Sequence, residues 1–294
     1  MKPVVNGLPA GAGSAFDMSA CCPVDACAGI DVAPHVQWFR RYAAFYLQLC
    51  SADKEPLQLK IDHTMRVFDN ARRILDDASS WEHTVFSEQR VIHRSALLAA
   101  LYHDTGRFPQ YIAYGTFNDR TSVNHGFLGC RTLRQLNVLG AEPARVSRNA
   151  LAAIVMHNRM ALPAGICAEL RFVTEVVREA DKLDIMSVIA EYLQPDGPRN
   201  DVVTLHLADE PEKWTAGIAE SVLSGGAVRY EDMRYLNDFI LLLCNWVFGL
   251  HFTASCKMVR RQGVMEKLVH QLPADKSGTL GLVRDKVLIA VAAA

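Results

Sequence analysis

The chain has 294 residues, half of them hydrophobic, and its 31 basic and 32 acidic side chains leave a formal net charge of −1. This length can bury at least one large core, which excludes a wholly disordered protein. A chain so close to neutrality has no broad cationic surface for backbone phosphates, so we expect no nucleic-acid polymer as a partner.

The eight cysteines indicate reduced thiols. Five of them lie singly in apolar or helix-like stretches, which is typical of an intracellular protein without a disulfide framework. The remaining three, Cys21, Cys22 and Cys27, lack a second pair at zinc-finger spacing, so we interpret them as thiols of a loose tail.

Two features predict a cytoplasmic protein without a membrane partner. Polar and helix-breaking residues interrupt the first thirty positions, which is unlike a secretory signal. The most apolar run, residues 239–252, is shorter than the ~20 residues that a bilayer span needs. We expect this run to form a buried core helix.

The first two thirds of the chain predict a poorly ordered N-terminal tail followed by a helical core. Residues 1–32 are rich in Gly, Ala, Pro and Cys and show no helical or strand period. Apolar residues then recur at helical spacing, and Gly and Pro separate the segments. We predict an all-α core over residues 33–195, with helices at 36–49, 61–78, 87–104, 123–139, 145–157 and 168–193.

The last third predicts a mostly helical C-terminal extension, residues 196–294, that packs on this core. Residues 195–200 are typical of a boundary, and the alternation at 202–207 favours a short strand. Helices are predicted at 214–223, 232–252, 256–272 and 280–293. The apolar helix near residue 240 either extends the core or forms the interface of a homodimer.

Histidines and aspartates lie on the apolar faces of five predicted helices. An inward carboxylate is costly unless a cation or hydrogen bonds compensate it. Imidazole and carboxylate ligands from separate helices suit Fe, Mn, Co, Ni or Zn, although any single inward histidine can also be a hydrogen-bonded core residue. The candidate ligands are His63, His103, Asp104, His125, His157 and Asp181.

The order and flanking words of these residues resemble the HD-domain superfamily of metal-dependent phosphohydrolases. The words are HTMRVFDNARRIL around His63, LLAALYHDTGRF around His103 and Asp104, and VREADKLDIM around Asp181. The resemblance covers roughly residues 60–190. It implies an all-α bundle that holds a metal through these four residues.

The resemblance also implies a second metal. His125 and His157 fall where binuclear members of the superfamily carry further ligands, so that Asp104 would bridge two ions. In the alternative, the site is mononuclear and these two histidines bind substrate phosphate. The chain lacks a Gly-Tyr-Pro signature near the doublet and a second His just after it, so cyclic-dinucleotide and deoxynucleotide specificities are not supported.

The expected chemistry is hydrolysis of a phosphate ester by a metal-activated water. Asp104, Arg107 and Lys182 are the candidate catalytic residues, and the last two would also bind substrate beside Arg66 and Asn158. Arg107 can bind phosphate but cannot act as an acid at neutral pH.

We expect a nucleotide or another small phosphorylated metabolite as substrate. Two alternatives remain open at this point. One is a di-iron oxygenase of the myo-inositol oxygenase type, and the other is a non-catalytic sensor that binds a nucleotide.

Overall fold

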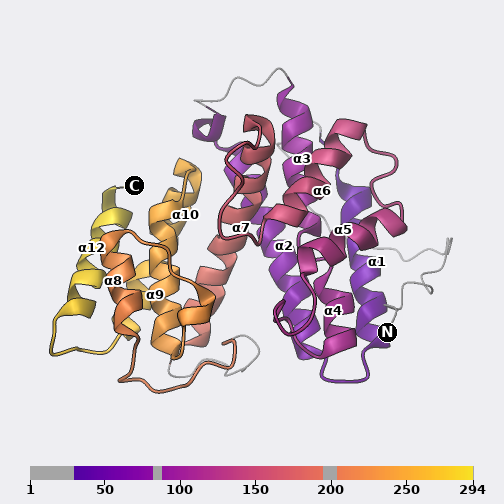
Figure 1. Ribbon diagram of the computed structural model, residues 1–294. Coiled ribbons are helices and arrows are strands. Elements are labelled where there is room, and N and C mark those ends of the chain that lie inside the picture. Colours follow the sequence, from indigo (N-terminus) through magenta and orange to yellow (C-terminus); the bar gives the residue numbers. More distant parts are fainter. Residues whose placement is uncertain (1–29, 82–87, 195–203, 294) are drawn as a thin grey trace. The chain divides into compact units, whose positions relative to one another are not determined.

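The computed structural model describes residues 30–81, 88–194 and 204–293, and these residues form helices and connecting turns (Figure 1). No strand occurs within these ranges, so the predicted all-α class is confirmed. The predicted tail lies outside the described residues except for its end, where Ile30 and Val32 are buried. The predicted boundary at residues 195–200 lies outside them too, and the two predicted domains stay predictions.

The chain divides into two compact units that are not continuous in sequence. The first contains Met1–Phe68 and Phe86–Val177, and the second contains Asp69–Val85 and Arg178–Ala294. Two long helices, α2 (Glu55–Asp76) and α7 (Ala168–Tyr192), each begin in the first unit and end in the second.

The first unit is built around α3 (Gln89–Tyr102). Its last seven residues, beginning at Ala96, are all buried, because the helix is apolar on every side at this end. It packs against α6 (Ala144–Met156) and α1 (Ala33–Leu49). In addition, α4 (Arg107–Tyr114) contacts α1, and α5 (His125–Gln135) contacts α4 and α6 (Figure 1).

Helix α4 is an element that the pattern analysis missed, because Pro109 reads as a helix breaker. Pro109 is the third residue of the helix. The N–H groups of a first turn have no partner within the helix, so a proline there removes no helical hydrogen bond. The helix ends at Gly115, whose φ of +65° is the left-handed conformation that glycine adopts readily.

Two close backbone approaches bring α4, α5 and α6 together. A Cβ atom added to Gly106 would lie 2.1 Å from the carbonyl oxygen of His125 and 2.6 Å from the amide of Gly129. A Cβ atom on Gly126 would lie 2.7 Å from the carbonyl oxygen of Ile154. These glycines therefore permit helix contacts that any larger residue would prevent.

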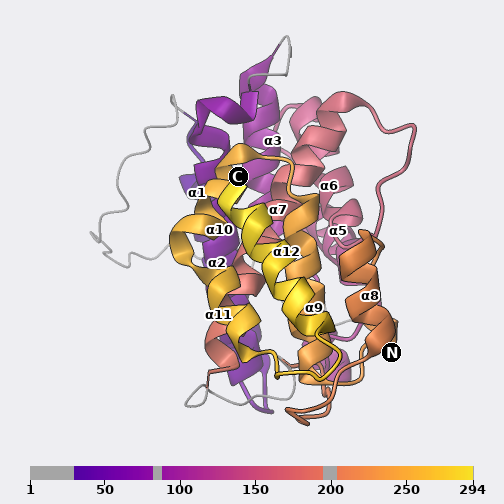
Figure 2. The ribbon, with the colours of Figure 1, turned by 90° about the vertical axis from the view of Figure 1, so that its left-hand side faces the viewer.

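The second unit packs its helices on the apolar helix α9. This helix buries eight consecutive residues, beginning at Asn237, and contacts α8 and α11 (Figure 2). Helix α12 contacts α8, α10 and α11. The bounds are α8 (Ala216–Ser224), α9 (Leu236–Trp246), α10 (Thr253–Gln262), α11 (Val264–Gln271) and α12 (Thr279–Ala293), and the 3₁₀ turns are η1 (Ala78–Trp81), η2 (Tyr230–Asp232) and η3 (Val247–Gly249).

Three predictions for this region were wrong in detail. The predicted helix at 256–272 is two helices, because Gly263 between them has a φ of +59°. The predicted helix at 232–252 covers a 3₁₀ turn, α9 and a second 3₁₀ turn. Of the predicted strand at 202–207, the first two residues lie outside the described residues, and residues 204–206 form a turn in which Leu205 and His206 have positive φ.

None of the described helices combines the length and hydropathy needed to cross a membrane.

Candidate metal centre

Five of the six predicted ligands lie in the first unit, and all five are buried. They come from four helices. His63 lies in α2, His103 and Asp104 directly follow α3, His125 is the first residue of α5, and His157 directly follows α6.

His103 and His157 have the same local structure. Each is the C-cap of its helix, and each places Nδ1 next to the carbonyl oxygen three residues earlier. The distances are 2.8 Å from His103 to Ala100 and 2.7 Å from His157 to Ile154. Since a carbonyl only accepts, Nδ1 must carry the hydrogen, and in the neutral form of each ring Nε2 keeps its lone pair.

His125 has its Nδ1 hydrogen directed to a carboxylate instead. Its Nδ1 lies 2.7 and 2.9 Å from the two oxygens of Asp119, and its Nε2 points into the site. The pKa of His125 is lowered, first by burial and then by the positive charge of Arg107, although Asp119 acts in the opposite direction. The ring is therefore neutral at pH 7, and its Nε2 is also an acceptor.

The Nε2 atoms surround the carboxylate of Asp104 on two sides. Oδ2 lies 3.6 Å from Nε2 of His63 and 3.7 Å from Nε2 of His103. Oδ1 lies 3.3 Å from Nε2 of His125, which is itself 3.0 Å from Nε2 of His157. One carboxylate thus separates two pairs of imidazoles.

This donor set fits a divalent cation. Two ring nitrogens that both carry lone pairs cannot hydrogen-bond to each other, yet those of His125 and His157 lie 3.0 Å apart. Nε2 of His63 and His103 are 3.3 Å apart. Two ligands bound to one Zn²⁺-like ion at ~2.1 Å lie roughly 3 to 3.5 Å apart, so both pairs have the spacing of a shared ion. His103, Asp104 and His157 also form a group with ligand atoms within 4.8 Å of one another.

Charges around the site keep Asp104 ionised. Burial alone would raise its pKa, but the positive charges of Lys60 and Arg107, together with the neighbouring imidazoles of His103 and His125, hold the pKa well below the ordinary value. The C-terminal ends of α3 and α6 add partial negative charge, because the last carbonyls of a helix have no partner within it. The site therefore favours bound positive charge.

Three residues beside the candidate site were missed by the sequence analysis. Lys60 lies one turn before His63 on the same helix, and its Nζ is 2.8 Å from Oδ2 of Asp104. Asp119 precedes α5 and contacts His125, and Gln110 of α4 is fully buried beside Asp119. A lysine three residues before a predicted ligand was a usable signal, whereas nothing in the pattern marks Asp119 or Gln110.

Arg107 is enclosed by polar contacts. Its Nε lies 3.3 Å from Oδ1 of Asp104, and its Nη1 lies 3.0 Å from Oδ1 of Asp119 and also reaches the carbonyl of Phe117. The ring of Phe117 lies near both Arg107 and Lys60, with centroid distances of 5.8 and 5.6 Å. Arg107 is thus held beside the carboxylate of Asp104.

The other predicted substrate-binding residues differ in their positions. Asn158, which is exposed, directs Nδ2 to Oδ2 of Asp119 at 3.1 Å. Arg66, also exposed, lies three residues after His63 on α2. Lys182 lies on α7 in the second unit and is half-buried. Their contact with substrate stays a prediction.

Asp181, the sixth predicted ligand, belongs to the second unit. It lies on the continuous helix α7, one turn after Val177 and two turns after Val173, both of which are fully buried in the first unit. Coordination by Asp181 stays a prediction.

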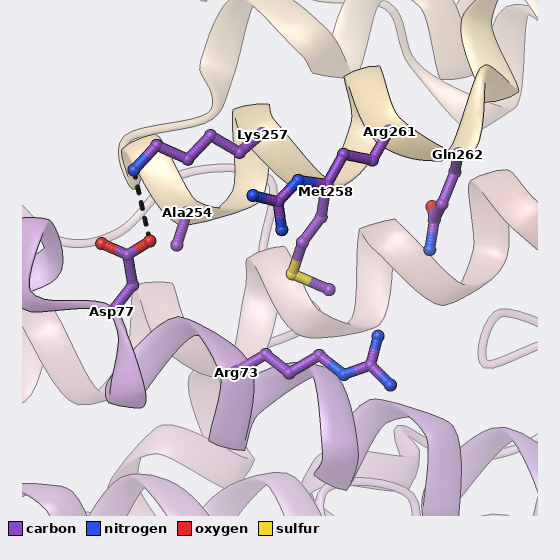
Figure 3. A pocket seen from close by; sticks show the side chains of 7 residues that line it. All are labelled: Arg73, Asp77, Ala254, Lys257, Met258, Arg261 and Gln262. Atoms are coloured by element: carbon purple, nitrogen blue, oxygen red, sulfur yellow. Dashed lines mark hydrogen bonds and ion pairs between the residues drawn. The ribbon is translucent and has the colours of Figure 1, made fainter.

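A separate hollow of about 180 Å³ lies in the second unit (Figure 3). Lys257 of α10 points to Asp77 across its edge, with 3.3 Å between Nζ and Oδ2. Its lining contains none of the predicted site residues and consists of Arg73, Asp77, Ala254, Lys257, Met258, Arg261 and Gln262.

Comparison with known families agrees with this geometry. The family model of the HD domain matches residues 61–209, a range that contains all six predicted ligands. The chain belongs to the HD-domain family. HD domains form a superfamily of metal-dependent hydrolases, so the buried His and Asp groups are candidate metal ligands. No curated protein and no solved structure matches the chain.

Proposed function

We propose that this HD-domain protein is a metal-dependent phosphohydrolase that cleaves the phosphate ester of a nucleotide or another small phosphorylated metabolite. The observation that carries the proposal is the direction of the histidine nitrogens. The acceptor nitrogens of His103, His125 and His157 converge on one ionised carboxylate, and a divalent cation makes that arrangement favourable.

Two ions are proposed, one on each side of Asp104. His63 and His103 face Oδ2, and His125 and His157 accompany Oδ1. Asp181 is proposed as a further ligand of the first ion, because α7 is one continuous helix and its fully buried Val177 lies on the same face one turn earlier. Fe, Mn, Co, Ni and Zn all suit this set of nitrogen and oxygen ligands.

The chain's own residues supply the rest of the proposed chemistry. A bound divalent ion would provide hydroxide at neutral pH by lowering the pKa of a water ligand. Lys60 and Arg107 lie beside Asp104 and would offset the negative charge that develops on the phosphoryl oxygens. Arg107 would act through its charge, since a guanidinium does not release a proton at neutral pH.

Four polar side chains are proposed to hold the substrate, namely Arg107, Lys182, Arg66 and Asn158. Asn158 and Arg66 are exposed, and Lys182 follows the proposed ligand Asp181 directly. Asp104, Arg107 and Lys182 are the proposed catalytic residues.

The test is metal content and hydrolysis in Asp104→Asn, which keeps the shape of the side chain and removes its charge. We expect the purified wild type to contain a divalent metal and to release phosphate from at least one compound in a screen of phosphorylated metabolites. The variant is expected to lose the metal and at least 100-fold of the turnover, since the bridging ligand is removed. Asp62→Asn is the charge-matched control, because Asp62 is exposed on α2 and accepts only a local hydrogen bond from Gln58.

Three results would contradict the proposal. Full metal occupancy in Asp104→Asn would overturn the ligand assignment. Two irons with an oxygen-dependent product would favour the oxygenase. Tight nucleotide binding without any product, over long incubation with several metals, would favour a sensor.

A further inference from the structure

The segment between α4 and α5 places one carboxylate against the outer nitrogen of His125. Both oxygens of Asp119 lie within hydrogen-bond distance of Nδ1, at 2.7 and 2.9 Å. His103 and His157 instead use the neutral carbonyl groups of their own helices. Among these three histidines, His125 alone has its outer nitrogen bound to a full negative charge.

Asp119 is held in this position by three polar side chains, of which Gln110 is fully buried. Nε2 of Gln110, which is fully buried, lies 2.9 Å from Oδ1 of Asp119 and 2.9 Å from the carbonyl oxygen of Val123. Nη1 of Arg107 lies 3.0 Å from the same Oδ1, and Nδ2 of Asn158 lies 3.1 Å from Oδ2. The carboxylate is therefore fixed from three directions rather than attached to a freely moving loop.

This arrangement has a direct effect on the opposite nitrogen of the ring. A carboxylate that accepts the Nδ1 hydrogen fixes the tautomer and the orientation of an imidazole, and it makes Nε2 a stronger electron donor. It also brings a second negative charge towards a cation held by His125. A neutral carbonyl also fixes the tautomer and the orientation, but it brings no negative charge towards the cation.

We propose that Asp119 is a positioning residue that orients His125. It selectively strengthens binding of the ion held by His125 and His157, relative to binding of the ion held by His63 and His103. The inference rests on the proposed binuclear centre and deepens it. The same network explains why Arg107 contacts both Asp104 and Asp119, since this side chain links the bridging carboxylate to the carboxylate behind His125.

The experiment is a metal titration of the metal-free full chain with Mn²⁺ and with Co²⁺, followed by calorimetry and by elemental analysis after gel filtration. We expect two binding events in the wild type. Asp119→Asn is expected to weaken one of them by 10- to 100-fold and to leave the other unchanged. Asp119→Glu should recover part of the loss, and Asp62→Asn should leave both events as in the wild type.

A second measurement is made on the wild type, and a variant serves only to assign the signal. In metal-free wild-type protein, the Nδ1 proton of His125 should give a strongly downfield imidazole resonance, because it is hydrogen-bonded to a carboxylate. His125→Gln, in which this proton is absent, assigns the resonance. An unprotonated Nδ1 in the wild type would overturn the inference.

The outcomes separate the inference from the proposed function. Two unchanged binding events in Asp119→Asn, or an equal loss at both, would overturn the role of Asp119 and leave the metal centre intact. A wild type that binds one ion, or none, would count against the binuclear centre itself and remove the basis of the inference.

Discussion

Three buried histidines of the first unit each have a defined acceptor for the Nδ1 hydrogen, and that property belongs to single residues. His103 and His157 direct Nδ1 to a carbonyl, and His125 directs it to Asp119. The apolar faces of the helices made these histidines predictable from the sequence. The acceptor behind each ring was not predictable, because Asp119 lies in a connection whose path depends on contacts with α4.

The lowered pKa of His125 predicts a pH dependence of stability in metal-free protein. The unfolded chain takes up a proton on His125 near pH 6.5, while the folded chain does so only at lower pH. The free energy of unfolding should therefore be fully retained above pH 6.5 and should fall as the pH decreases towards the folded pKa. The slope from this residue is at most ~1.4 kcal/mol per pH unit.

Urea denaturation with a chelator, between pH 7.5 and pH 4.5, measures this slope. His125→Gln should flatten it relative to the wild type, because the variant lacks the group that titrates. Equal slopes in the two proteins would show that His125 titrates in the folded state as it does in the unfolded state.

At the scale of the elements, helices α4, α5 and α6 meet through close contacts at glycines. The sequence analysis did not predict these contacts. Gly106 was read only as the end of a helix, yet it is the point where α4 begins against the backbone of α5. Gly126 and Gly129 lie inside α5, where glycine is intrinsically unfavourable. Such a glycine within a helix indicates a close approach, but it does not identify the partner element.

Gly106→Ala should therefore damage both the fold and the metal centre. The added methyl group would require the start of α4 and the start of α5 to separate, which would move His125 away from Asp104. We expect a loss of ~1 to 3 kcal/mol in the free energy of unfolding together with weaker metal binding. Denaturant titration and elemental analysis measure the two effects.

Gly165→Ala is the control for this prediction. Gly165 is exposed, and a Cβ atom there has no neighbouring atom within 4 Å. A Gly106→Ala protein as stable and as rich in metal as Gly165→Ala would show that the helices can separate without consequence.

At the scale of the whole molecule, helical periodicity predicted the class and most of the helices. Prediction of the helix bounds failed where a proline or a glycine is compatible with two different local structures. Pro109 can break a helix or occupy its first turn, and Gly263 can lie within a helix or end one. The division into units could not be read along the chain, since residues 69–85 group with residues 178–294 through contacts between distant segments.

The unequal burial of two cysteines predicts unequal thiol reactivity. Cys244 lies inside α9 with no exposed surface, and burial raises its pKa to about 12, while Cys167 is exposed. At pH 8 the thiolate fraction of Cys244 is roughly a thousandfold below that of a thiol with the ordinary pKa of 9.0. Brief iodoacetamide treatment of native protein should modify Cys167 and spare Cys244, as measured by peptide mass spectrometry.

Full denaturation provides the control, since both thiols should then react at similar rates. Rapid modification of Cys244 in native protein would show that α9 opens readily under these conditions.

In the proposed metal centre, the C-cap positions of His103 and His157 would couple cation binding to the ends of two helices. Each ring is anchored to the carbonyl three residues earlier, so fraying of the last turn of α3 or α6 turns the coordinating nitrogen away. Occupancy of the centre must then slow hydrogen exchange of the amides in those terminal turns. Hydrogen exchange at these two helix ends would thus report whether the metal is bound.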